Sequence, residues 1–138
     1  MGDAMSGQLV FPNLRYASPR SAIEFLSSAF GFDVHFIVDA DDGDVEHAQL
    51  LVGTNLVFLS RDHEADRYGM HSPEVLRGTT QALCIRVPEG ELAQHQAHAE
   101  TSSARILNPV HKSLAGVLEY TCADPEGHVW TFSSYAGE

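Results

Sequence analysis

Apolar residues recur at helical spacing in one stretch of the chain and alternate with polar residues in most of the others. Between residues 19 and 30 the spacing predicts a helix with one apolar face, formed by Ala22, Phe25, Leu26, Ala29 and Phe30. Ser18 is placed to cap this helix, and Pro19 suits its first turn. Gly31 follows the last apolar position and is expected to end the helix.

Segments of period-two alternation predict strands on both sides of this helix. Residues 8–16 form the first, with Pro12 at an edge or a bulge. Three more follow the helix, at residues 33–39, 45–52 and 55–60. The acidic stretch at 39–44 and the pair Gly53-Thr54 separate them as hairpin turns would.

The second half of the chain repeats this order. Residues 80–87 predict a strand, residues 91–102 a weaker helix, and three further strands follow at 105–110, 117–123 and 129–133. The run Asp124-Pro125-Glu126-Gly127 is typical of a β-turn. We therefore predict one α+β domain over 1–138 made of two tandem βαβββ modules, at about 9–62 and 79–135, joined by a polar connector at 63–78 that holds at most a short helical turn.

Length and composition agree with a globular protein. The 138 residues are 43% hydrophobic and 20% charged, which is enough apolar material for a core. The sequence shows no apolar run of the ~18 residues that a membrane span needs, and residues 1–8 do not resemble a signal peptide. Two cysteines, Cys84 and Cys122, cannot form a disulfide framework, so we expect a reduced, cytoplasmic protein.

The chain is strongly acidic, with 19 Asp and Glu against 8 Lys and Arg and a formal charge of −11. Phosphate-rich partners attract the opposite sign, so we expect no binding to nucleic acid or to membranes. Acidic surfaces commonly serve solubility alone. Where they do more, they favour a cationic ligand.

Four stretches together resemble a known family. They are the helix entry at 16–26 with its end at Ala29-Phe30-Gly31-Phe32, the strand Glu46-His47-Ala48-Gln49-Leu50, the connector run at 68–73, and the segment from Asp124 to Phe132. The chain resembles the vicinal oxygen chelate superfamily, within its glyoxalase/bleomycin-resistance/dioxygenase group, from about Val10 to Tyr135. The resemblance implies a U-shaped mixed sheet around a ligand cavity, with helices on the outer face. It also implies a homodimer and leaves several activities open, because a fold hosts many functions.

Enzymes of this superfamily hold a divalent metal through His, Gln and Glu donors on the first and last strand of each module. Carried onto this sequence, the donor positions fall near Phe11, at Val57 or Phe58, at Ala82 or Gln81, and at Thr131. Phe, Val and Ala cannot bind a metal, and the alternation of residues places Gln81 on the opposite face. We therefore expect neither a metal nor another cofactor. If a metal does bind, His47 is the first ligand to consider.

Strand alternation also selects the residues that face the predicted cavity. If Ala48 and Leu50 face the helices, their neighbours on the strand face the other way. The same argument applied to each strand yields the candidate ligand-binding residues Asn13, Arg15, His47, Gln49, Cys84, Arg86, Thr131 and Ser133. They equally fit a simpler interpretation, in which they bond one another or face solvent. Trp130 and Phe132 alternate with Thr131 and Ser133 along their strand, so we expect them to face the core. A cysteine between Leu83 and Ile85 is typical of a buried, inert thiol.

Three hypotheses follow. The first is a metal-free small-molecule-binding protein resembling the bleomycin-resistance proteins, for which the acidic charge favours a cationic ligand. The alternative is a metal-dependent glyoxalase-like lyase, isomerase or transferase, or a dioxygenase, with His47 among the ligands. The third is a metal-free enzyme in which His47 is a general base and Arg15 or Arg86 holds an anionic substrate.

Overall fold

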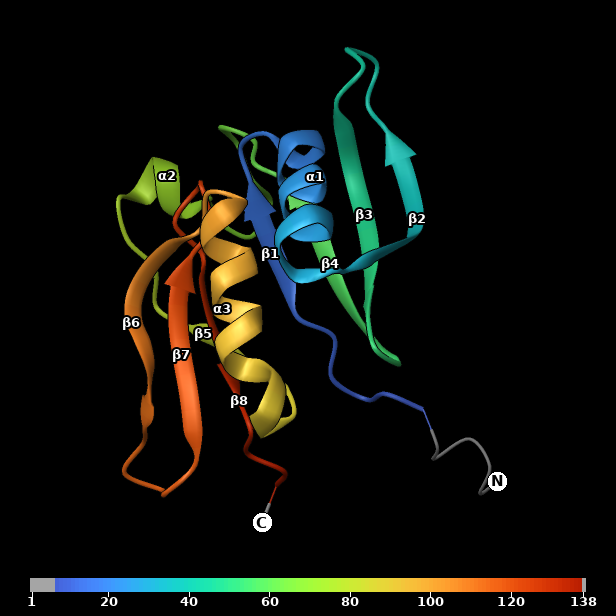
Figure 1. The fold of residues 1–138 in the computed structure, drawn as a ribbon. Coiled ribbons are helices and arrows are strands. Elements are labelled where there is room, and N and C mark those ends of the chain that lie inside the picture. The colour runs from blue at the N-terminus through green and yellow to red at the C-terminus, as the bar shows by residue number, and fades with distance from the viewer. Residues whose placement is uncertain (1–6, 138) are drawn as a thin grey trace.

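The chain folds into two βαβββ modules, which the computed structural model describes over residues 7–137 (Figure 1). Module 1 consists of β1 (Asn13–Tyr16), α1 (Pro19–Phe30), β2 (Asp33–Asp39), β3 (Val45–Val52) and β4 (Asn55–Arg61). Its sheet has the order β1-β4-β3-β2, in which β1 runs parallel to β4 and the other neighbours are antiparallel.

Module 2 repeats this arrangement after a connector that contains the short helix α2 (Pro73–Leu76). Its elements are β5 (Ala82–Arg86), the 3-10 turn η2 (Glu89–Glu91), α3 (Leu92–Thr101), β6 (Arg105–Lys112), β7 (Leu118–Ala123) and β8 (Val129–Ser133). The strand order β5-β8-β7-β6 matches that of module 1. The predicted tandem repeat is therefore confirmed.

The two sheets remain separate, and the helices lie together on one side of them. Helices α1 and α3 contact each other, and Figure 1 shows both in front of the strands. Each sheet has four strands, and no ladder in the described part of the chain joins β1 to β5. Each sheet consequently keeps one face against the helices and one face open. No helix within residues 7–137 is long and apolar enough to cross a membrane.

The core between the modules is largely aromatic. The ring of Phe30, at the end of α1, lies 4.7 Å from Phe132 and 5.7 Å from Trp130, measured between centroids. Phe32 also packs on Trp130, at 5.6 Å. Trp130 and Phe132 are almost completely buried, which confirms the prediction that they belong to the core. Since aromatic side chains bury large apolar areas, this cluster contributes strongly to the contact between the two halves.

The turn before β8 forms a buried hydrogen-bonded link between the modules. The Asp124 carboxylate, which is 4% exposed, accepts hydrogen bonds from the Tyr16 hydroxyl of module 1 and from Trp130 Nε1 at 3.1 Å. Its other oxygen accepts the backbone N–H groups of Glu126 and His128. Burial, followed by the nearby Asp124 charge, raises the pKa of Tyr16 well above its ordinary value, so the phenol stays protonated and donates.

The same turn also caps α1. Both carboxylate oxygens of Glu126 accept backbone N–H groups, from Ala17 at 2.6 Å and from Ser18 at 2.9 Å. The sequence had predicted that the Ser18 side chain would cap this helix, but it makes no cap hydrogen bond. A carboxylate from the other module supplies the negative charge that a helix N-terminus favours. His128 Nε2 completes the link by donating to the Arg15 carbonyl at 2.7 Å.

The predicted first strand is too long at its start, because β1 begins only at Asn13. Pro12 has no N–H to donate, although its carbonyl accepts from the Phe58 N–H at 2.8 Å. Further upstream, the Gln8 side chain bonds both the N–H and the carbonyl of Leu56. An amide side chain therefore occupies the hydrogen-bonding groups that a longer strand would have used.

Candidate functional site

The open face of the first sheet carries four of the eight predicted ligand-binding residues. On β3, Ala48 and Leu50 are buried against the helices, so His47 and Gln49 lie on the open face. The register places Asn13 and Arg15 of β1 on the same face. The parity prediction is therefore consistent with the structure for these four residues.

A row of hydrogen-bonded polar side chains crosses this face. Ser60 lies between His47 and Asn13: its hydroxyl donates to Asn13 Oδ1 at 3.0 Å and is 3.2 Å from His47 Nδ1. Gln49 Nε2 lies 3.4 Å from His47 Nε2 on the other side. Since the Ser60 hydrogen goes to Asn13, Ser60 accepts from His47 Nδ1–H, and His47 Nε2 then accepts from Gln49. This order of donors assigns to His47 the neutral tautomer with its proton on Nδ1.

His47 is held neutral and next to an aromatic surface. Burial lowers its pKa below the ordinary histidine value. Its ring packs edge-to-face with the ring of Phe58, with centroids 5.4 Å apart. The contact between Gln49 and Nε2 is long for a hydrogen bond, so a ligand donor can displace it. His47 thus offers a nitrogen acceptor on a partly apolar surface.

Arg15 has a different role from its neighbours, because it binds the connector. Its side chain is 8% exposed, and its Nε donates to Asp66 Oδ1 at 2.7 Å. This hydrogen bond is the main reason that the pKa of Asp66 lies far below its ordinary value. Asp66 Oδ2 accepts the N–H groups of Tyr68 and Met70, so the carboxylate also orders the connector. Nη1 of Arg15 is buried and has no hydrogen-bond partner among the described residues.

The other four predicted residues lie on the open face of the second sheet. Cys84 and Arg86 on β5 pair in register with Thr131 and Ser133 on β8. The Thr131 hydroxyl is 2.8 Å from that of Thr121 on β7, so these two groups bond each other. Ser133 is 1% exposed and bonds the N–H of Tyr135. For Thr131 and Ser133, mutual or local hydrogen bonds account for the polar side chain.

Cys84 differs from the expectation of a buried thiol. It is exposed, whereas Cys122 is buried. The reason is that β5 is the edge strand of its sheet, so its open face has no neighbour on one side. Burial, with a smaller contribution from Glu119, still raises the pKa of Cys84, which keeps the thiol protonated near neutral pH.

Two of the cavities along the seam between the modules contain predicted ligand-binding residues. One, of about 440 Å³, contains Asn13 and Arg15 of module 1, with connector residues 69–71 and 78–81. The other, of about 740 Å³, contains Cys84 and Arg86 of module 2, with residues 52–57 of module 1. His47, Gln49, Thr131 and Ser133 line neither. A single chain therefore does not bring the eight residues into one cavity.

The metal-donor positions of module 1 do lie next to each other, but they carry aromatic side chains. Phe11 and Phe58 stack with centroids 5.3 Å apart and planes 18° from parallel. In module 2, Thr131 is bonded to Thr121. Within residues 7–137 no group of three or more His, Cys, Asp or Glu side chains is placed to hold a metal ion. The residues at these positions do not fit the metal that the superfamily's enzymes use.

Sequence reasoning missed two residues of this region. Ser60 joins His47 to Asn13, and the alternation along β4 with Leu59 buried would have found it. Asp66 lies in the connector, where no periodicity predicts a contact with β1. Only a comparison with related sequences would have linked Asp66 to Arg15.

A family model describes most of the chain. The model of the Glyoxalase/Bleomycin resistance protein/Dioxygenase superfamily matches residues 8–132. The chain belongs to this superfamily. No curated protein sequence matches it significantly.

Solved structures of the superfamily share the fold at low sequence identity. TioX from Micromonospora sp. ML1 is 24% identical over 94% of this chain and 100% of its own, with a TM-score of 0.70. A mutant of the fosfomycin resistance protein FosX from Listeria monocytogenes, complexed with Mn(II) and 1S,2S-dihydroxypropylphosphonic acid, is 11% identical over 95% of this chain and 92% of its own, with a TM-score of 0.69. Lactoylglutathione lyase from Agrobacterium tumefaciens is 14% identical over 91% of this chain and 92% of its own, with a TM-score of 0.65. At these identities the likeness concerns the fold.

Proposed function

We propose that this chain is a metal-free small-molecule-binding protein of the bleomycin-resistance type. The observation that carries the proposal is the stacked pair Phe11 and Phe58, which stands where a metal-binding relative would place two donors. Stacked rings next to the polar row of His47, Ser60 and Asn13 make a surface that is apolar with a few ordered polar groups. Small-molecule sites have this composition.

Metal content is the first test of the proposal. Untagged protein from metal-supplemented medium, passed over a mild chelator, is expected to contain far less than one metal ion per chain by mass spectrometry. One ion per chain that survives this treatment would contradict the proposal. It would favour the metal-dependent glyoxalase-like or dioxygenase alternative, with His47 as the first residue to mutate.

A thermal-shift screen then tests ligand binding itself. The panel contains cationic, neutral and anionic aromatic compounds, including bleomycin. The net charge of the chain predicts a preference for cations, and the neutral and anionic compounds test that preference. A ligand at 100 times its Kd stabilises the folded state by about 2.7 kcal/mol. His47→Ala is expected to reduce the shift. His35→Ala, which removes an exposed histidine from β2, is the control.

We also propose that the functional unit is a homodimer. The open faces have no cover in a single chain, and the first displays Phe36 at 51% exposure and Val38 at 42%. His47 and Gln49 on this face line neither seam cavity of the single chain, so a second copy is needed to enclose them. Light scattering at micromolar concentration is expected to give twice the chain mass of 15.1 kDa. A monomeric mass would contradict this part of the proposal.

A metal-free enzyme is the second candidate, and the ordered hydrogen bonds of His47 favour it. The row from Gln49 to Asn13 leaves Nε2 unprotonated, which is the state a general base needs. The test is to incubate each compound found in the screen with the protein and to follow its consumption by mass spectrometry. Turnover that His47→Ala leaves unchanged would eliminate His47 as the base.

A further inference from the structure

The larger cavity at the seam has apolar walls from both modules. Its volume is about 740 Å³, and its walls are Gln8, Leu9, Val10 and Pro12, residues 52–57, and the β5 residues Leu83 to Arg86. Val57 is buried at its base, and Leu83 and Ile85 are partly buried on one side. The volume lies in the range of about 300–1,000 Å³ that small-molecule sites occupy. We call this cavity the β5 crevice.

The wall opposite β5 is fixed in place although it is exposed. Gln8 Nε2 donates to the carbonyls of Val10 at 2.7 Å and Leu56 at 2.8 Å, and Gln8 Oε1 accepts the Leu56 N–H at 2.5 Å. These bonds hold Leu9 and Val10 at the rim, where they are 73% and 79% exposed. An ordered apolar wall that faces solvent is unfavourable unless something covers it.

Charge in the β5 crevice is opposite in sign to that of the whole chain. Arg86 is the one charged residue of its lining, and no Asp or Glu is among the lining residues. Arg15, Arg20 and Arg61 each pair with a carboxylate, whereas within residues 7–137 Arg86 has no such partner.

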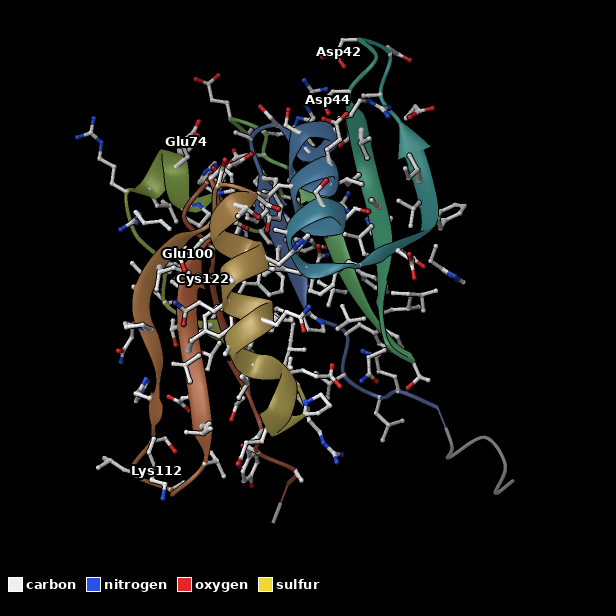
Figure 2. All side chains as sticks on the ribbon, viewed as in Figure 1. Asp42, Asp44, Glu74, Glu100, Lys112 and Cys122 are labelled. Carbon is white, nitrogen blue, oxygen red and sulfur yellow. The ribbon has the colours of Figure 1, made fainter. Side chains whose placement is uncertain are left out.

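The acids lie elsewhere on the molecule. Figure 2 shows Asp42 and Asp44 at the tip of the β2–β3 hairpin, Glu74 on α2 and Glu100 on α3. On the open face of the second sheet, Glu119 lies two strands from Arg86, opposite Ser133, and its Oε2 is 3.5 Å from His111 Nε2. At physiological salt, exposed charges more than about 8 Å apart are largely screened. Arg86 is therefore the charge in direct contact with the crevice, although the net charge of the chain is −11.

We propose that the β5 crevice binds an amphipathic monoanion, with its carboxylate on Arg86 and its apolar body along Val10, Leu83 and Ile85. This inference goes beyond the proposed function: Arg86 and Cys84 belong to the predicted ligand-binding set, but His47 and Gln49 do not line the crevice. A guanidinium binds a carboxylate through two parallel hydrogen bonds. The neutral Cys84 thiol beside Arg86 adds no competing charge.

The test compares probes that differ in the head group. Decanoate, decanol and decyltrimethylammonium are titrated into the full-length protein by calorimetry, the two ions below their micelle concentrations and decanol below its solubility in water. Decanoate is expected to bind at least tenfold more tightly than the other two, because only it pairs with arginine. Shortening the chain to octanoate should weaken binding by about tenfold, at roughly threefold to fourfold for each methylene. Equal affinity for the cationic probe would overturn the proposal.

A matched pair of variants tests whether decanoate binding depends on Arg86 itself. Arg86→Gln is expected to lower decanoate affinity at least tenfold and to leave decanol affinity unchanged. Arg105→Gln removes the same charge from an exposed position on β6 and should leave both affinities unchanged. If the two variants have the same effect, the attraction is nonspecific and the proposal fails.

Cys84 reports on the crevice directly. It is the exposed cysteine of the two, so iodoacetamide at pH 8.5 should alkylate it and spare the buried Cys122. Saturating decanoate is expected to slow alkylation of Cys84 at least tenfold, as measured by peptide mass spectrometry. If Cys84 is instead protected in the free protein and becomes reactive on dilution, the crevice is an interface with a second copy and the proposal is wrong.

The two proposals fail separately. Stoichiometric metal would refute the metal-free function whatever decanoate does. A compound from the thermal-shift screen that depends on His47, together with no protection of Cys84 by decanoate, would leave the binding function standing and overturn the assignment of the β5 crevice.

Discussion

The buried carboxylate of Asp124 offers a quantitative test of how the two modules are joined. It accepts four hydrogen bonds, two from the side chains of Tyr16 and Trp130 and two from backbone N–H groups of its own turn. Asp124→Asn keeps the size of the side chain but leaves one acceptor oxygen. In either orientation of the amide, two buried donors then face an NH2 group instead of an oxygen.

The expected cost follows from these two donors. Each buried donor without an acceptor destabilises the folded state by about 1–3 kcal/mol, so Asp124→Asn should lower the free energy of unfolding by about 2–6 kcal/mol. Domains of this kind have total stabilities of about 5–15 kcal/mol, so the variant should still fold at low temperature. Asp41→Asn removes the same charge from the exposed hairpin and should change stability by less than about 0.5 kcal/mol.

Urea unfolding provides the measurement. The chain has a single tryptophan, Trp130, which itself donates to Asp124, so its fluorescence follows this region. Far-ultraviolet circular dichroism checks that both variants are folded before urea is added. If Asp124→Asn and Asp41→Asn unfold within about 1 kcal/mol of each other, the buried carboxylate does not hold the modules together and the reasoning is wrong.

Three further predictions follow from single contacts. Gly127→Ala should destabilise the protein more than Gly43→Ala, by about 1–3 kcal/mol in urea unfolding. Both glycines have a positive φ (+100° and +89°), but only a Cβ added at Gly127 meets another atom, Pro73 Cβ at 3.2 Å. Equal costs would contradict the packing argument. The lowered pKa of His47 means that protonation opposes folding, so its contribution to stability is complete above its unfolded pKa of about 6.5 and is lost as the pH falls through the lower folded value. An NMR titration of the His47 ring that gives a pKa at or above 6.5 would refute this. Asp66→Asn should speed tryptic cleavage after Arg67, because Asp66 holds the connector to Arg15 and to two backbone N–H groups, whereas Glu64→Gln should not.

The helices and strands, and the side of the sheet on which each strand residue lies, were predictable from the sequence. The helix α1 and its end at Gly31 follow from spacing and from a glycine that adopts φ +76°. His47 and Gln49 lie on the open face because alternate residues of a strand point to opposite sides and Ala48 is buried. These properties depend on neighbours within a few residues, which the sequence displays directly.

Contacts between distant segments were decided only by the tertiary structure. The sequence suggested that Ser18 caps α1, but the cap comes from Glu126, 108 residues away along the chain. It suggested a buried Cys84, but the position of β5 at a sheet edge exposes the thiol. It grouped eight residues in one cavity, whereas the packing of α1 against α3 leaves two separate open faces. The chain's own periodicity determines which side of a strand a residue faces; which other segment lies on that side depends on how the modules pack, and no local pattern encodes it.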